Sequence, residues 1–347
     1  MYGKILIRAT NWVGDAVMSL PALQAVRSRF PDAHIAVLAR PWVADLYARE
    51  TCVDRVIRYE PRAGFRDLRL KWRTARILSR ERFDVAILFQ NAFEAAAIAR
   101  LAGIPRRIGY DRDARGWLLT DAIPVPAKGE IPRHERFYYL ELLRSAGLIG
   151  DIPAADCIRL QGAEEARRAG EALFGKRSIP LPVIGVSPGA AYGAAKQWLP
   201  ERFAEAAATM AAGHRASVVV FGSGGERALC ETVRSQIEAR GAQAWNLAGN
   251  TGLREFIDLA AACRLYLTND SGAMHIASAL GVPTVAIFGA TDDTATGPTG
   301  PLARVVREPV ECSPCLLREC PIDHRCMTGV SSKRVAEEAT ALWKRAV

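Results

Sequence analysis

The segment Thr268–His275, with the sequence TNDSGAMH, combines residue types that bind anions. It follows a short apolar run and precedes a helical pattern, so we expect it to join a strand to the N-terminus of a helix. Such a terminus presents free N–H groups and a partial positive charge to a phosphate. Asp270, Ser271 and His275 add polar side chains at the same place. An Asp or Ser that caps the helix explains part of this pattern, but not the whole polar cluster.

Two further loops have a composition suited to a nucleotide. Residues 187–198 (SPGAAYGAAKQW) carry one cation, Lys196, among small residues that let backbone N–H groups approach an anion. The alternative is a surface loop with a solvated lysine. Residues 222–227 (GSGGER) place Glu226 where a carboxylate can hold a ribose diol through paired hydrogen bonds. A glutamate in the first turn of a helix is also favourable with the helix dipole alone.

Asp15 ends the loop NWVGD, residues 11–15, which follows the first apolar run of the chain. A carboxylate at the mouth of a cleft can accept a proton from a substrate hydroxyl, so Asp15 is a candidate general base. The alternative is structural, because aspartate is a favoured helix N-cap. The loop is not GxGxxG and the chain has no Walker A motif, so neither of these nucleotide motifs is present.

The elements that must position these loops alternate along the chain. Short apolar runs predict strands at Lys4–Ala9, His34–Ala39, Asp84–Phe89, Val183–Val186, Ser217–Phe221, Leu265–Thr268 and Thr284–Phe288. Longer patterns predict helices at Ala16–Arg29, Glu94–Leu101, Glu201–Ala212, Arg227–Arg240, Leu253–Ala262 and Ala273–Leu280. This alternation predicts an α/β fold with doubly wound parallel sheets. Ligands bind beyond the carboxyl ends of such strands, so we expect the site in a cleft between two domains.

The length of 347 residues exceeds what a single core usually supports, which predicts two domains. Glycines and prolines between residues 150 and 182 predict a linker there. We therefore expect one domain over 1–175, a second over 176–330 and a terminal helix within 331–347. No apolar stretch reaches about 18 residues and the first residues are not a signal peptide, so we expect a cytoplasmic protein.

The net charge of +9, most of it in the first half, predicts an acidic partner such as nucleic acid, a phosphorylated substrate or an anionic lipid surface. The alternative is an ordinary soluble protein rich in arginine. Nucleic acid is disfavoured as the partner, because the sequence has no helix-turn-helix signal, no aromatic stacking motif and no zinc-finger spacing.

Several of these motifs together resemble a known family. Residues 11–15, the loop 187–198, Phe221-Gly222-Ser223, Asn246-Leu247-Ala248-Gly249 and residues 269–275 are similar, in order and spacing, to the lipopolysaccharide heptosyltransferases of glycosyltransferase family 9. Within that family the chain resembles most the enzymes that add the second heptose of the inner core. Those that add the first heptose, or that use another core acceptor, are the alternatives.

The resemblance implies a GT-B fold of two Rossmann-like domains. It implies ADP-L-glycero-D-manno-heptose as the donor, bound by the C-terminal domain. The acceptor it implies is a phosphorylated or acidic heptosyl-Kdo2-lipid A core, held by the N-terminal domain. Transfer would invert the anomeric centre without a metal or other cofactor. The terminal helix, Ser331–Ala346, would pack back towards the first domain, and the protein would act at the cytoplasmic face of the inner membrane.

The same resemblance implies roles for individual residues. Asp15 would be the general base, and Lys196 would neutralise the departing ADP pyrophosphate. Glu226 would bind the ribose, and the stretch Leu247–Thr251 would lie near the adenine. The full set expected to contact the donor is Ser187, Gly189, Lys196, Gly222, Ser223, Glu226, Leu247, Gly249, Thr251, Asp270, Ser271, Gly272 and His275.

Arginines at positions 66, 69, 73, 76 and 80 recur at helical spacing, which predicts that they share one helix face. A solvated face is the alternative to a functional one. Because the run has a single sign, we expect it to contact phosphates of the acceptor or the membrane surface. The set expected to bind the acceptor is Asn11, Trp12, Arg66, Arg69, Arg73, Arg106 and Arg107, and Arg112 and Arg115 are expected beside it.

Four of the eight cysteines cluster at Cys312, Cys315, Cys320 and Cys326, with His324 nearby. In a cytosolic protein such a cluster favours metal over disulfide. The spacing is not that of a standard zinc finger, so a structural zinc, a redox-labile pair and inert thiols all remain open. We expect no catalytic metal.

Overall fold

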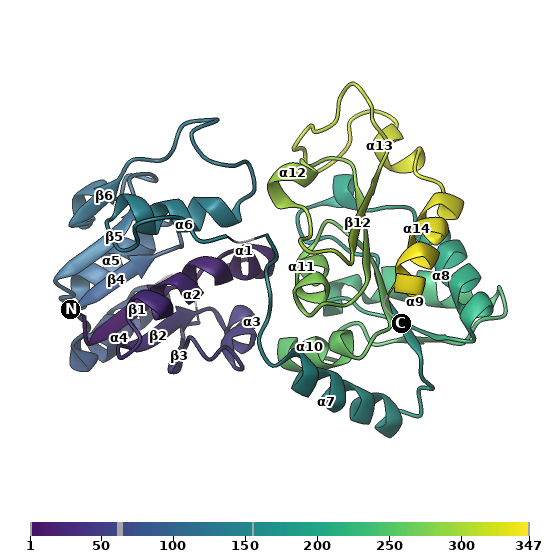
Figure 1. The fold of residues 1–347 in the computed structure, drawn as a ribbon, viewed down its shortest axis with the longest axis horizontal. Helices are drawn as coiled ribbons and strands as arrows, with labels where there is room; N and C mark the ends of the chain where they lie inside the picture. The colour runs from purple at the N-terminus through teal and green to yellow at the C-terminus, as the bar shows by residue number, and fades with distance from the viewer. Residues whose placement is uncertain (1, 61–64, 155, 346–347) are drawn as a thin grey trace. The chain divides into compact units, whose positions relative to one another are not determined.

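The computed structural model describes residues 2–60, 65–154 and 156–345, and the side chains of Phe65 and Arg66 lie outside the description. The chain divides into two compact units, residues 1–155 and 156–347. Each unit is built around a six-stranded sheet whose neighbouring strands all run parallel. Parallel sheets need helical crossovers, which is why strands and helices alternate in both units (Figure 1). The predicted α/β, doubly wound architecture is confirmed.

The first sheet has the strand order β3-β2-β1-β4-β5-β6. Its three central strands are almost entirely buried, as apolar strands covered on both faces must be. The strands are β1 (Lys4–Arg8), β2 (His34–Ala39), β3 (Arg55–Arg58), β4 (Val85–Leu88), β5 (Arg106–Tyr110) and β6 (Asp121–Ile123). The helices are α1 (Val13–Met18), α2 (Leu20–Arg29), α3 (Pro41–Ala44), α4 (Phe65–Glu81), α5 (Phe93–Leu101) and α6 (Arg136–Ser145).

The second sheet has the order β12-β11-β10-β7-β8-β9. Its strands are β7 (Val183–Ser187), β8 (Ser217–Val220), β9 (Ala244–Asn246), β10 (Leu265–Asn269), β11 (Thr284–Phe288) and β12 (Ala303–Arg307). Its helices are α7 (Ala163–Lys176), α8 (Pro200–His214), α9 (Arg227–Glu238), α10 (Leu253–Ala261), α11 (Gly272–Ala279), α12 (Asp293–Thr296), α13 (Arg325–Thr328) and α14 (Ser332–Arg345). One buried cluster joins the sheet to α8, α9 and α14, and another joins it to α7, α10 and α11.

The division between the units comes earlier than the predicted boundary at residue 175, because the predicted linker contains α7. This helix lies along α10 (Figure 1). A side chain at Gly170 of α7 would come within 1.9 Å of the Asp258 carbonyl of α10, so the two helices approach as closely as a glycine permits. The helix predicted within residues 331–347 is α14, which packs on α8 of its own unit. Packing of this helix towards the first domain stays a prediction.

The predicted long helix Ala16–Arg29 is divided into α1 and α2. The break is at Ser19, whose hydroxyl donates to the Ala16 carbonyl at 2.8 Å, and Pro21 lies in the first turn of α2. Proline is tolerated there because its missing N–H has no intrahelical partner. None of the helices in the described ranges is long and apolar enough to cross a membrane.

Candidate functional site

The carboxyl edge of the second sheet gathers most of the predicted donor-binding residues. Strands β10, β7, β8 and β9 are consecutive in this sheet, so the loops that follow them leave the same edge side by side. These loops cover residues 270–271, 188–199, 221–226 and 247–252. The sequence placed its candidate residues in four separate stretches, and the sheet order makes those stretches neighbours.

Lys196 and Asp270 form an ion pair at this edge, with Nζ 2.5 Å from Oδ2. Both side chains are largely buried, at 13% and 5% exposed. Thr291 donates its hydroxyl to the same carboxylate oxygen at 2.6 Å, and the Lys196 ammonium lies 4.7 Å from the centre of the Tyr192 ring. Lys196 is therefore not the solvated surface lysine of the alternative interpretation. An ammonium has three donors, so a pair with one carboxylate leaves donors for a further anion.

The Glu226 carboxylate lies against Gly189, in the loop of residues 188–199 that follows β7. It accepts hydrogen bonds from the Ser223 N–H and hydroxyl, both at 2.8 Å, which is the capping box of the 3₁₀ turn Gly224–Glu226 that precedes α9. A Cβ at Gly189 would lie 2.0 Å from Oε1 of Glu226, so a glycine is needed for the carboxylate to lie there. Glu226 has a structural role as a cap, and its second oxygen faces the 187–198 loop.

Gly249 joins the loops that follow β8 and β9. Its N–H donates to the Gly222 carbonyl at 3.0 Å, and a Cβ at this position would lie 2.9 Å from Cα of Gly224. With φ of +73° and this close approach, residue 249 has two reasons to be glycine. Leu247 is buried beside it, and Thr251 is half-buried.

The loop after β10 begins α11. Ser271 occupies the N-cap position without a side-chain cap hydrogen bond, and its hydroxyl lies 3.1 Å from that of Thr268. Ser271 and Gly272 are half-buried, while His275 is 4% exposed. Capping therefore does not account for Ser271, and the first turn of α11 has polar groups that capping leaves unexplained.

Two residues of this edge have internal partners that the sequence did not reveal. Asn269 accepts from the Trp198 N–H at 3.0 Å and donates to the Pro188 carbonyl at 2.6 Å, so it fastens the 187–198 loop at both ends. The Ser187 hydroxyl, predicted to contact the donor, is 2.7 Å from the Tyr266 hydroxyl and buried. Ser187 therefore anchors the start of the 187–198 loop to β10 through its hydroxyl.

The cysteine-rich segment, residues 312–326, forms hydrogen bonds to the 187–198 loop that carries Lys196. The Ala195 N–H donates to the Arg318 carbonyl at 2.9 Å, His324 Nε2 lies 3.0 Å from the Ala195 carbonyl, and the Tyr192 hydroxyl donates to the Leu316 carbonyl at 2.7 Å. These contacts are made by residues 192 and 195 and hold the backbone that leads directly to Lys196. The cysteine-rich segment therefore helps to position the loop of the candidate site.

All eight cysteines are free thiols. The pKa of Cys326 is raised by burial and then by the neighbouring thiols at positions 312, 315 and 320, so the four lie near one another. In the part of the chain that the structure describes, no three His, Cys, Asp or Glu side chains are placed to hold a metal ion. Zinc binding by Cys312, Cys315, Cys320 and Cys326 stays one of the three alternatives.

Asp15 lies at the carboxyl edge of the first sheet, in the first turn of α1. The N-cap position of this helix is Trp12, and no side chain caps it, so the interpretation of Asp15 as an N-cap is wrong. Asp15 is half-buried. Its charge acts on two residues that the sequence did not single out. The pKa of Glu135 is raised by burial and then by Asp15, and the pKa of buried Tyr139 is raised well above its ordinary value by the same two causes in the same order.

The arginine run lies on α4, as predicted, except that the side chain of Arg66 lies outside the described residues. Arg69, Arg73, Arg76 and Arg80 are exposed. Beside them the apolar side chains of Leu68 and Trp72 are 62% and 56% exposed. Arginines and apolar residues therefore share one solvent-facing surface, which we call the α4 face: Leu68, Arg69, Trp72, Arg73, Arg76, Ile77 and Arg80.

Arg106 and Arg107 are not brought to the edge that carries Asp15, because they begin β5 and so lie at its amino end. Arg106 pairs with Asp121 at 2.7 Å, and Arg107 donates to the Ile104 and Leu118 carbonyls at 2.6 and 2.8 Å. Arg115 is fully buried and donates to the Tyr110 carbonyl at 3.0 Å and to the Asn91 side chain at 2.9 Å. These three arginines stabilise the first unit internally.

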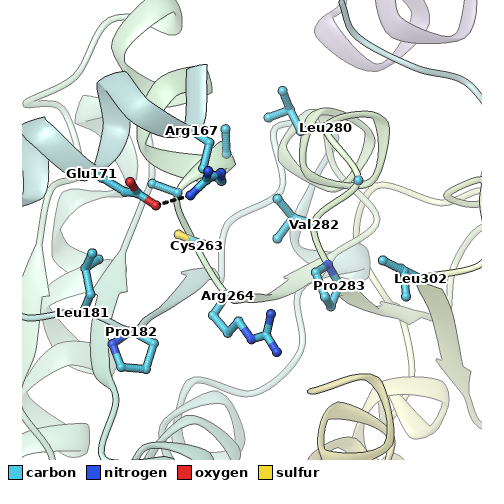
Figure 2. A pocket seen from close by; sticks show the side chains of 13 residues that line it. Arg167, Glu171, Leu181, Pro182, Cys263, Arg264, Leu280, Val282, Pro283 and Leu302 are labelled. Carbon is cyan, nitrogen blue, oxygen red and sulfur yellow. Dashed lines mark hydrogen bonds and ion pairs between the residues drawn. The ribbon is translucent and has the colours of Figure 1, made fainter. Parts of the chain in front are cut away.

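A cavity of about 390 Å³ opens at the opposite, amino edge of the second sheet (Figure 2). Several of its lining residues directly precede strands: Pro182 comes before β7, Arg264 before β10 and Pro283 before β11. Arg167 lies at its rim and is paired with Glu171. None of the residues predicted to bind the donor lines this cavity, and its position separates it from the loops that carry them.

Known proteins match this chain over most of its length. The family model described as glycosyltransferase family 9 (heptosyltransferase) matches residues 71–325. Lipopolysaccharide heptosyltransferase 2 of Escherichia coli is 31% identical over 346 residues, 98% of each chain. Lipooligosaccharide heptosyltransferase 2 of Haemophilus influenzae is 33% identical over 320 residues, 88% of each chain. The solved structure of E. coli ADP-heptose lps heptosyltransferase II matches 99% of each chain with a TM-score of 0.83 and 30% identity.

Proposed function

The chain belongs to glycosyltransferase family 9, and we propose that it is a heptosyltransferase II, which transfers L-glycero-D-manno-heptose from ADP-heptose to a heptosyl-Kdo2-lipid A core. The observation that carries this proposal is the gathering of Lys196, Asp270 and Glu226 at one edge of a sheet. The relatives with heptosyltransferase 2 in their names, matched over nearly the full chain, support the choice of the second heptose.

The reaction is a displacement at the anomeric carbon of the donor. A hydroxyl oxygen of the acceptor forms the new bond to that carbon, and the bond from the carbon to the ADP phosphate breaks. Asp15 takes the proton of the hydroxyl as the oxygen attacks. ADP leaves as an anion, and attack from the face opposite the leaving group inverts the anomeric centre.

The second unit stabilises the leaving group. Lys196, held by Asp270 and by the loop that the cysteine-rich segment supports, places a fixed cation where negative charge develops. The first turn of α11 adds backbone N–H groups at the same edge. Preorganised charges of this kind lower a barrier because they need no reorganisation during the reaction. Glu226 is the carboxylate in position to accept from the ribose hydroxyls.

Incubation with ADP-heptose and a heptosyl-Kdo2-lipid A acceptor tests the proposal. We expect release of ADP and a new glycosidic bond whose anomeric configuration, read by NMR, is opposite to that of the donor. A product that retains the donor configuration would overturn the direct displacement and with it the role of Asp15. Absence of ADP release with this donor would overturn the proposal itself.

We propose that the α4 face binds acidic groups of the acceptor at an anionic membrane surface. Exposed leucine and tryptophan beside exposed arginines are typical of surfaces that lie in a lipid interface. Arg76 stacks on Trp72 with its guanidinium carbon 4.7 Å from the ring centre, which leaves the charge and the ring exposed together. This face and the base Asp15 belong to the same unit.

Reversing charge on this face is expected to damage acceptor use alone. The double variant Arg69→Glu, Arg73→Glu should raise the acceptor KM several-fold at low salt and leave the KM for ADP-heptose unchanged. The effect should shrink as salt rises, because exposed charges are screened beyond about 10 Å at about 0.1 M. Steady-state kinetics at two salt concentrations measure it, and an unchanged acceptor KM at low salt would return these arginines to a solvated face.

Metal chelation is expected to leave transfer unchanged. The proposed displacement uses the Lys196 ammonium and backbone N–H groups where other enzymes use a divalent cation. A short assay after treatment with EDTA, with untreated enzyme as the control, measures this. Immediate loss of turnover that zinc restores would contradict the metal-free mechanism.

A further inference from the structure

Two buried arginines lie beneath the loop that leads to Asp15. Arg8 ends β1 and Arg40 follows β2, the neighbouring strand, and they are 1% and 6% exposed. Glu94, in the first turn of α5, faces both arginines: its Oε1 is 2.8 Å from Nη2 of Arg40 and 3.9 Å from Nη2 of Arg8. The other carboxylate oxygen of Glu94 is 3.2 Å from Nζ of Lys71.

Burying this cluster of charged side chains lowers the stability of the fold. Burial, and then the charge of Arg40, lowers the pKa of Arg8 to about 10. Nε of Arg8, Nη1 of Arg40 and the hydroxyl of Tyr59 are buried without a hydrogen-bond partner among the described residues. Buried donors that lack partners destabilise a fold. Nη1 of Arg8 does donate to the Ala9 carbonyl at 2.6 Å, but the unpartnered donors mean that the two guanidiniums are only partly explained by internal hydrogen bonds.

Both guanidiniums converge on one neutral oxygen. Oδ1 of Asn11 accepts from Nη2 of Arg8 at 3.1 Å and from Nε of Arg40 at 3.3 Å. The backbone carbonyl of Asn11 accepts from the indole N–H of Trp42 at 2.9 Å. The residue is thus held at both its side chain and its main chain, four positions before Asp15.

The two arginines also fix which atom of the amide remains available. Guanidinium groups only donate, so the atom that faces them must be the amide oxygen, and the amide nitrogen is the other end. Nδ2 of Asn11 donates to no described residue, and Asn11 is only half-buried. An oriented donor four residues before a general base, at the same edge of the sheet, can bind an oxygen of the sugar whose hydroxyl the base deprotonates.

We propose that Arg8, Arg40 and Glu94 are positioning residues that orient the Asn11 amide, so that its Nδ2 donates to an oxygen of the acceptor sugar beside the attacking hydroxyl. The assignment rests on the proposed function, because it takes the sugar acceptor and Asp15 from there. Arg40 acts through Asn11 and touches no substrate. Its loss therefore matters only while Asn11 is present.

A double-mutant cycle tests this coupling. Asn11→Ala should raise the acceptor KM about 3–10-fold, the net value of one neutral hydrogen bond, and leave the donor KM unchanged. Arg40→Met should give a smaller rise of the same kind, because Arg8 still holds Oδ1 and Glu94 keeps Lys71 as a partner. The double variant should be no worse than Asn11→Ala. Arg40→Lys, which keeps the charge and can still donate, should recover part of the loss.

The matched control is Arg55→Met. Arg55 also pairs with a carboxylate, Glu81 at 2.8 Å, but begins β3 at the amino edge of the sheet, so neither KM should change. Additive effects of Asn11→Ala and Arg40→Met on the acceptor KM, or a rise of the donor KM by the same factor, would overturn the positioning role. If Asp15→Asn keeps full activity while the cycle remains non-additive, the base assignment fails and the orientation of Asn11 stands.

Discussion

Replacing Lys196 with alanine is expected to lower turnover by two or more decades. A single preorganised charge at a developing anion is worth about 3–4 kcal/mol of transition-state stabilisation, which corresponds to this loss. The acceptor KM should change little, because the acceptor is expected on the first unit. Steady-state kinetics with ADP-heptose measure the loss, and near-normal turnover in the variant would remove Lys196 from the site.

The ion pair complicates this variant, and its partner provides the control. Asp270 is 5% exposed, so alanine at position 196 leaves a buried carboxylate without its cation, which typically costs about 3–5 kcal/mol of stability. The double variant Lys196→Met, Asp270→Asn removes both charges and should regain much of the lost melting temperature. Its turnover should stay low. Recovery of turnover together with stability would mean that Lys196 serves the fold and not the leaving group.

Replacing Asp15 with asparagine is also expected to lower turnover strongly. Asparagine keeps the size of the side chain but cannot take a proton, and removal of a general base typically costs about 10²–10⁴ in rate. The fold should survive, because the lost interaction with the dipole of α1 is worth about 0.3–1 kcal/mol. ADP-heptose should still bind and raise the melting temperature.

Glu135 supplies the matched control for Asp15. It is a carboxylate whose pKa Asp15 perturbs, so it lies in the same surroundings, but the mechanism assigns it no proton transfer. Glu135→Gln should keep turnover within about tenfold of the parent, on the scale of a single perturbed interaction. Full activity in Asp15→Asn, or an equal collapse in Glu135→Gln, would contradict the assignment of Asp15 as the base.

The sequence predicted the central strands well because they are buried on both faces. Runs such as VAIL at Val85–Leu88 and TVAIF at Thr284–Phe288 are short, almost entirely apolar and rich in β-branched residues, which is typical of strands buried on both faces. The strands that were missed are mostly at or near an edge. Arg55–Arg58 and Ala303–Arg307 each carry two arginines around a pair of apolar residues and face solvent in part, so they lack a longer apolar run.

Loop composition predicted part of the candidate site. The residues that it missed or misplaced have physical explanations. Lys196, Asp270 and Glu226 could be found because strand-to-helix loops of a parallel sheet share an edge. The Asn269 and Glu135 contacts could not, because they depend on which residues distant in sequence meet in three dimensions. Arg106 and Arg107 were expected at the acceptor because of their charge. Their position at the start of β5 directs them to internal carbonyls and to Asp121.

The mass of the reaction product distinguishes the two possible acceptors. Purified protein is incubated with ADP-L-glycero-D-manno-heptose and, in parallel, with Kdo2-lipid A or heptosyl-Kdo2-lipid A, and the products are weighed by mass spectrometry. We expect the second acceptor to gain one heptose residue and the first to stay unchanged. Extension of Kdo2-lipid A, with the heptosylated acceptor left unmodified, would contradict the account and make the protein an enzyme of the first heptose.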